Sequence, residues 1–311
     1  MAGSVVVGLD GTEQADAAAE WAADEAVLRG TGVHLVHVLE PSPDLLVPLV
    51  SREPVASWGE KLLAHTAARL RESRPGLSVT TRLLPSDPVT SLVLATEERG
   101  DLLVLGSRAL GGVAGYLLGS VGMTVAGRIE RPVVLVRAPD PPGRETLDAD
   151  GPDGPGALDP ESPEAPSSGA PVVVGVDLRD PVDGVLAFAF AEAASRRTEV
   201  RVVHARRLPL HDRLVPSGTP EARQAHAVSP EVLRSLEGLL EPWRERFPEV
   251  ASTGRVVAGS AGQELPRAAE GAALVVVGRR TRRSTLGAHL GSVAHAVLHH
   301  VRAPVAVVPH D

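Results

Sequence analysis

The chain has 311 residues, of which 43% are hydrophobic, so it can bury the core of one large or two ordinary domains. It contains no cysteine, which excludes disulfides, thiol nucleophiles and cysteine-ligated metal sites. The 2% aromatic content and the lack of a long apolar run disfavour nucleic-acid base stacking and membrane spans, whereas seven of the eight net negative charges lie in residues 138–170 and say nothing of the binding surfaces. No charged leader precedes the first apolar run, so we expect a cytoplasmic protein that binds neither nucleic acid nor membrane.

Short β-branched apolar runs alternate with amphipathic segments from the N-terminus onwards. The first run is followed by a segment whose alanines share one helical face while its acidic residues lie on another. Such alternation favours a parallel sheet covered by helices on both faces. The predicted strands are 4–9, 33–39, 78–84, 102–105 and 132–137; the predicted helices begin at Gly11–Thr12 and lie near 55–73, 89–99 and 119–129.

The same plan then occurs a second time. Five segments return in the same order, with an offset of 167 for Asp10 and Asp177 and an offset of 172 later in the chain. We therefore predict a tandem duplication. The recurring pairs are VVVGLD with VVVGVD, LVHV with VVHA, DLLVLG with ALVVVG, LLGSV with HLGSV, and RPVVLV with APVAVV.

A segment of different composition separates the two copies. Of the 33 residues from 138 to 170, eight are proline and eight are acidic, and no apolar period is present. Such a segment cannot bury enough apolar surface to offset its ordering entropy. We predict a first domain at 1–138, a disordered linker at 139–170 and a second domain at 171–311.

A glycine-rich stretch, GSRALGGVAGYLLGSV, follows the fourth predicted strand and leads into a helix at Gly119–Ser120. Its glycines allow backbone N–H groups to point at an anion, and the helix N-terminus favours phosphate. The alternative is a loop that ends in an ordinary serine N-cap. A P-loop is excluded because the chain's single lysine, Lys61, lies elsewhere, and no GxGxxG follows the first strand.

These residues resemble the universal stress protein family, in its tandem two-domain actinobacterial form. The resemblance rests on VVVGLDG, VHV, RPVVLV and the family's G-x2-G-x9-G-[ST] motif, which spans Gly106 to Ser120 here. It covers both repeats. It implies two doubly wound domains, each a five-stranded parallel sheet in the order 3-2-1-4-5, packed through their fifth strands as an internal pseudo-dimer. A further homodimer is an option.

The resemblance also implies an ATP site in the first domain. The aspartate after the first strand faces the ribose–phosphate region, where Mg²⁺ with ATP is an option, and the second strand's backbone holds adenine. A helix N-cap is the alternative role for Asp10. The implied nucleotide-binding residues are Gly8, Asp10, Val38, Gly106, Ser107, Arg108, Ala109, Gly119, Ser120 and Val121.

The second copy departs further from the motif. Ala109 replaces the motif's second glycine in the first copy, and β-branched Thr281 replaces it in the second, where a positive φ would be strained. Arginines 279, 280, 282 and 283 either replace the backbone cradle or form a solvated face of a degenerate site. The residues of this weaker second site are Gly175, Asp177, Ala205, Gly278, Thr281, Gly291, Ser292 and Val293.

No pattern of a nucleophile, base or metal cluster accompanies these motifs. His37 and His204 recur in the second strands without partners at ligand spacing, so we interpret them as structural. We expect an ATP-binding stress-response protein and not an enzyme, although slow ATP hydrolysis stays open. The alternative is a regulatory interaction protein whose nucleotide sites are vestigial.

Overall fold

The computed structural model describes residues 3–39, 52–107, 120–138, 169–180, 183–207, 219, 228–281 and 290–310. The predicted linker therefore lies almost wholly outside the described residues. Within them, no helix is long and apolar enough to cross a bilayer. The first domain contains β1 (Ser4–Leu9), α1 (Glu13–Arg29), β2 (Val33–Leu39), α2 (Arg52–Ser73), β3 (Val79–Pro85), α3 (Pro88–Arg99), β4 (Gly100–Ser107), α4 (Ser120–Arg128) and β5 (Val133–Arg137).

The second domain repeats this order of elements. Its third helix is short and contains Pro266. The elements are β6 (Val172–Gly175), α5 (Asp183–Arg196), β7 (Val200–Arg206), α8 (Pro230–Arg246), β8 (Ser252–Ala258), α9 (Ala261–Ala268), β9 (Leu274–Arg280), α10 (Ser292–His300) and β10 (Val305–His310).

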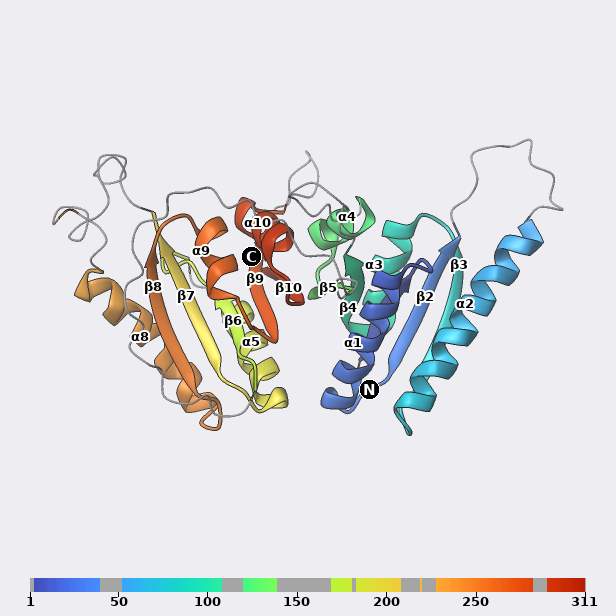
Figure 1. Ribbon diagram of the computed structural model, residues 1–311, viewed down its shortest axis with the longest axis horizontal. Coiled ribbons are helices and arrows are strands. Elements are labelled where there is room, and N and C mark those ends of the chain that lie inside the picture. Colours follow the sequence, from blue (N-terminus) through green and yellow to red (C-terminus); the bar gives the residue numbers. More distant parts are fainter. Residues whose placement is uncertain are drawn as a thin grey trace.

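All ten strands form one sheet, in the order β3-β2-β1-β4-β5-β10-β9-β6-β7-β8. Each half reads 3-2-1-4-5, and all pairs within a half are parallel. The halves join where β5 pairs with β10 in the antiparallel sense, with Ala306 opposite Val134. The predicted fold and the contact between the fifth strands are thus confirmed (Figure 1).

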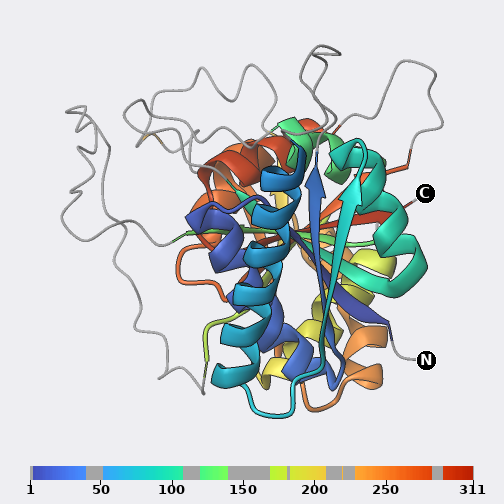
Figure 2. The ribbon, with the colours of Figure 1, turned by 90° about the vertical axis from the view of Figure 1, so that its right-hand side faces the viewer.

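Helices cover both faces of this sheet, as the view along it shows (Figure 2). Side chains alternate across a strand, so Val5 and Val7 pack with α1 and α2, while Val6 packs with α3 and α4. The predicted alanine face of α1 is buried. Helix α1 begins at the N-cap Thr12 and ends at Gly30, whose φ of 63° is the left-handed conformation that glycine adopts readily.

An ion-pair ring joins α1 and α5 across the domain boundary, and the sequence reasoning missed it. Arg29 pairs with Glu25 on its own helix and with Glu192 on the other, and Arg196 pairs with the same two carboxylates. The glutamates are 1% and 3% exposed. Both pairs of like residues are 167 apart, the offset of the repeat, so the ring is nearly two-fold symmetric.

Candidate functional site

The first domain has a cavity of about 330 Å³ at the carboxyl ends of β1, β2 and β4. It lies where the strand order reverses between β1 and β4, which is where doubly wound sheets bind ligands. The walls are mostly apolar. The lining residues are Gly8, Leu9, Asp10, Thr12, Ala15, Val36, His37, Val38, Pro88, Leu92, Leu105, Gly106, Ser120, Val121 and Gly122.

Asp10 lines this cavity but does not cap α1. Its carboxylate accepts hydrogen bonds from the Thr12 backbone N–H at 3.1 Å and the Thr12 hydroxyl at 2.6 Å. Thr12 is itself the cap, since its Oγ1 accepts from the N–H of Ala15. The N-cap alternative for Asp10 is therefore wrong. The turn instead fixes where its carboxylate stands at the cavity wall.

His37 holds the ends of β1 and β2 together. Its Nδ1 lies 2.7 Å from the carbonyl oxygen of Leu9, which can only accept, so Nδ1 carries the proton. The ring meets Trp58 edge to face, with centroids 5.3 Å apart. His204 has the matching contact, 3.1 Å to the carbonyl of Val176. These contacts agree with the structural interpretation of both histidines.

The glycine-rich loop is only partly within the described residues. Arg108, Ala109 and Gly119 lie outside them. Ser107 is buried and does not line the cavity. Gly106 does line it, but close packing also requires its glycine: an added Cβ would lie 2.5 Å from the backbone carbon of Gln14 in α1. A phosphate role is thus not needed to explain Gly106.

The second domain has a cavity at the same strand ends, and it is larger, about 810 Å³. Seven of the eight residues predicted for the second site line it: Gly175, Asp177, Ala205, Gly278, Gly291, Ser292 and Val293. The eighth, Thr281, does not. Its N–H and hydroxyl both donate to the carbonyl of His310, at 2.6 and 2.9 Å, and its φ is not positive. The expected strain at this position is absent because the residue is tied to β10.

Arg279 matches neither alternative for the arginine-rich segment. It is 5% exposed, and its guanidinium donates to the carbonyls of Gly127, at 2.9 Å, and Ile129, at the end of α4 in the other domain. Carbonyls at a helix C-terminus attract a cation, while burial lowers the pKa of Arg279. It therefore acts as an interdomain bridge. Arg280 pairs with Asp180, and Arg282 and Arg283 lie outside the described residues.

Three further arginines at this cavity escaped the sequence prediction. Arg179, Arg206 and Arg207 line it, the first after β6 and the other two at the end of β7. Aligning the repeats beyond their matching segments would have found them, because the first copy has Thr12, Leu39 and Glu40 at these positions. The signal lies in this difference between the two copies.

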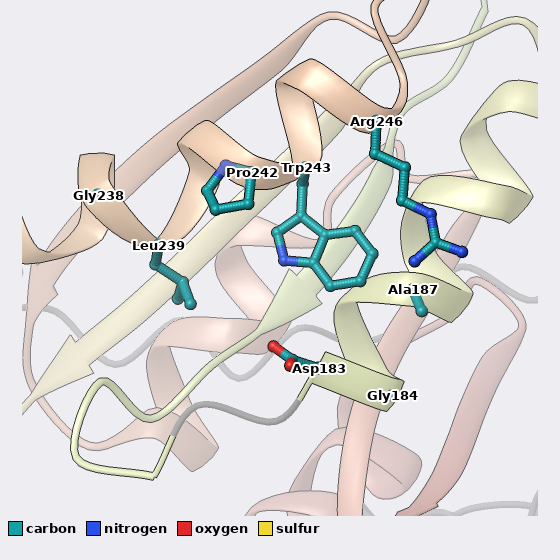
Figure 3. A pocket seen from close by; sticks show the side chains of 8 residues that line it. All are labelled: Asp183, Gly184, Ala187, Gly238, Leu239, Pro242, Trp243 and Arg246. Carbon is teal, nitrogen blue, oxygen red and sulfur yellow. The ribbon is translucent and has the colours of Figure 1, made fainter.

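A third cavity, about 440 Å³, lies between α5 and α8 on the outer face of the second domain. Trp243 forms its floor, with Asp183 and Arg246 on either side (Figure 3). In the first domain the matching seam is closed by ion pairs: Arg69 with Asp16, and Arg74 with Glu20 and Asp24. The register of β3 and β8 in the sheet matches Arg69 with Pro242 and Arg74 with Phe247. The repeat offset of 167 matches Glu20 with Ala187 and Asp24 with Ala191.

The chain was compared with known proteins. The model of the universal stress protein family matches residues 1–137 and 170–309. Universal stress protein Rv2005c of Mycobacterium tuberculosis is 33% identical over 316 residues, which span 97% of this chain and 96% of the relative. Universal stress protein Rv1996 of the same organism is 29% identical over 333 residues, spanning 99% and 96%.

A solved structure shows the same architecture over the full length. The crystal structure of a universal stress protein from Archaeoglobus fulgidus has a TM-score of 0.69 and 17% identity, and covers 99% of this chain and 98% of that one. This likeness supports the fold, and the family model and the relatives cover both repeats. The chain therefore belongs to the universal stress protein family, with two such domains in one polypeptide.

Proposed function

We propose that the first domain binds an adenine nucleotide, most simply ATP, and that occupancy of this site is how the protein takes part in a stress response. One observation carries the proposal: Asp10, Val38 and the N-terminus of α4 all line one cavity at the strand-order reversal. These residues lie on three separate segments of the chain. Their convergence is what a nucleotide site on this fold requires.

The residues of this cavity suit the parts of a nucleotide. Val36, Val38 and Leu92 offer apolar walls for a base, and the first turn of α4 has backbone N–H groups without helical partners, which attract phosphate. A carboxylate beside a triphosphate is repulsive unless it accepts from a ribose hydroxyl or shares a divalent cation. Asp10 is held in place for either role by Thr12.

Binding and not catalysis is the chemistry that these groups support. Within the described residues, no group of three or more histidines, aspartates or glutamates could hold a metal by itself. Any Mg²⁺ at this site would therefore arrive with the nucleotide. We assign no catalytic residue.

Calorimetry and extraction test the proposal. Protein purified from cells is denatured, its supernatant is chromatographed for adenine nucleotides, and ATP with Mg²⁺ is titrated into nucleotide-free protein. Gly122→Phe should fill the cavity and weaken binding at least tenfold. Gly122→Ala is the matched control, since Ala294 occupies this position in the second domain. Equal binding by both variants, or no heat at millimolar ATP in the parent, contradicts the proposal.

A second candidate is a regulatory interaction protein whose nucleotide sites are vestigial. It is favoured by Thr281, which replaces the motif glycine in the second domain and is bound to His310 instead of facing the cavity. On this reading, parent and variants show no nucleotide binding at either site. The protein then acts through its surface alone.

A further inference from the structure

The cavity between α5 and α8, on the outer face of the second domain, has no part in the proposed function. Its volume is about 440 Å³, and Trp243 forms its floor. Trp243 stacks with Phe190 and Phe247, at ring-centroid distances of 5.8 and 6.4 Å. Only 2% of the chain's residues are aromatic, so three stacked rings are a marked concentration. A hollow between helices with an apolar floor is a typical place for a ligand to bind.

The walls of this cavity leave room and offer a hydrogen-bond acceptor. Among the described residues, a Cβ added to Gly184 or to Gly238 would meet no atom within 4 Å. Pro242 lies inside α8 and has no N–H, so the carbonyl of Gly238 lacks its regular helical partner. Both Gly238 and Pro242 line the cavity. A ligand that donates a hydrogen bond here would satisfy this carbonyl.

Exposed arginines stand where the two helices end. Arg246 ends α8, and its guanidinium lies 5.6 Å from the ring centroid of Trp243, with Asp183 on the other side of that ring (Figure 3). Arg197 follows α5 with a φ of 53°, the left-handed conformation that Gly30 has at the matching position of the first copy. The second copy thus has an exposed arginine where the backbone favours glycine.

The linker between the domains meets the fold at this end of α5. Thr198, two residues past the helix, donates to the carbonyls of Gly169 and Ala170, at 3.3 and 2.9 Å. Ala187, in the cavity wall, lies about 14 Å along α5 from Arg196. A polyproline II strand covers about 3.1 Å per residue, so linker positions three and six residues before Gly169 lie about 9 and 19 Å from it. The last part of the linker therefore reaches the cavity.

This part of the linker, residues 159–166, lies outside the described residues but has a periodic sequence, DPESPEAP. Pro160, Pro163 and Pro166 recur at every third position. Glu161 and Glu164 have the same spacing. A polyproline II helix has three residues per turn, so it would place the prolines on one face and the glutamates on another. Aromatic-lined grooves bind proline faces of this kind, and arginine pairs with carboxylates.

We propose that residues 159–166 dock on the cavity between α5 and α8 of the same chain, with prolines on Trp243 and glutamates toward Arg246. Asp183 would repel the glutamates, so the strand lies with its acidic face on the Arg246 side. The first domain has Leu70 where the register of the sheet places Trp243, and ion pairs fill the matching seam. The docked segment leaves residues 139–158 as the connection between the two domains.

Cleavage of the full-length protein by a glutamate-specific protease tests the proposal. Glu161 and Glu164 lie in the docking segment, and Glu145, elsewhere in the same linker, is the internal reference. Gly238→Leu should fill the cavity and speed cleavage after Glu161 and Glu164 at least fivefold relative to cleavage after Glu145. Gly238→Ala is the matched control, because it also removes the helical glycine but leaves the cavity open, and it should be cleaved like the parent. Equal relative rates in the two variants would leave the cavity to some other ligand, and the proposal would be wrong.

An arginine pair and a dilution series complete the experiment. Arg246→Gln should speed cleavage of the docking segment at least threefold, whereas Arg234→Gln, an exposed arginine of α8 that does not line the cavity, should leave it unchanged. The same rate in both arginine variants would contradict the pairing of the glutamates with Arg246. The relative rates should not depend on protein concentration. Protection that grows with concentration would mean that the segment of a second copy occupies the cavity, which overturns docking within one chain.

Discussion

In the ion-pair ring between α1 and α5 the two copies contribute the same residues, whereas at their cavities they contribute different ones. The ring that joins α1 to α5 uses a Glu–Arg pair from each repeat, and Trp21 and Phe188, also 167 apart, each pack on an arginine from the other domain. At the strand ends, by contrast, Thr12, Leu39 and Glu40 of the first copy are replaced by Arg179, Arg206 and Arg207 in the second. A charged side chain at an exposed cavity rim can be introduced alone, whereas removing one member of a buried ion pair leaves its partner's charge uncompensated.

Removing one carboxylate from the ring should give the largest effect. Glu25→Ala or Glu192→Ala leaves two guanidinium groups beside the boundary with half of their partners, and each variant should lose about 3 to 5 kcal/mol of unfolding free energy. Urea denaturation measures this loss. Because the ring is nearly symmetric, the two variants should be similar.

The control for the ring is Glu13→Ala, an exposed residue on the same helix, which should change stability little. If Glu25→Ala lowers the unfolding free energy and Glu192→Ala does not, the two halves of the ring have the same geometry but do not contribute equally to stability.

The ring should also make stability depend on pH. Burial, reinforced by the neighbouring Glu25 carboxylate, raises the pKa of Glu192 from 4.5 to about 7. Between these values the folded protein holds a proton that the unfolded chain has lost, so the unfolding free energy falls as pH rises from about 4.5 to 7. One proton gives a slope of at most about 1.4 kcal/mol per pH unit.

Denaturation midpoints measured across this pH window check the slope. Glu192→Gln should flatten it, whereas the exposed Glu245→Gln should leave it as in the parent. A parent whose stability rises through the same window would contradict the assignment of the slope to Glu192.

The seam between α1 and α2, where the copies differ, should give the smallest effect. Arg69 pairs with Asp16 and Glu20, but all three side chains are more than a third exposed. Exposed ion pairs contribute little, so Arg69→Ala should cost less than about 1 kcal/mol in urea denaturation. A loss comparable to that of the ring variants would mean that this seam, and not the interface, holds the first domain together.

The sequence predicted what depends on local pattern. The apolar runs located the five strands of the first copy, and the second strand was predicted at its observed bounds, Val33–Leu39. Glu25 was missed because nothing nearby distinguishes a buried glutamate from a solvated one on an alanine-rich helix. Its partner across the domain boundary, Arg196, is 171 residues away, and only folding brings the two together.

The candidate site divides in the same way. Asp10, Val38 and Ser120 could be placed because each follows a recognisable strand or opens a helix. The role of Arg279 could not be predicted, because its acceptors are backbone carbonyls of the other domain. Every residue has a carbonyl, so the sequence does not indicate which ones accept. The sequence could not show whether Asp10 or Thr12 is the N-cap of α1, because both residue types cap helices well.

The antiparallel pairing of β5 with β10 and the nearly symmetric ring make each domain's contact surface almost self-complementary. A surface of this kind does not distinguish its covalently linked partner from the same domain on another polypeptide. Two chains can therefore exchange domains without losing a strand pair or an ion pair. Pairing of the two domains within one chain is then favoured only because their covalent connection keeps the effective concentration of the partner domain high. Concentration, rather than any new contact, would then set the balance between closed monomers and swapped assemblies.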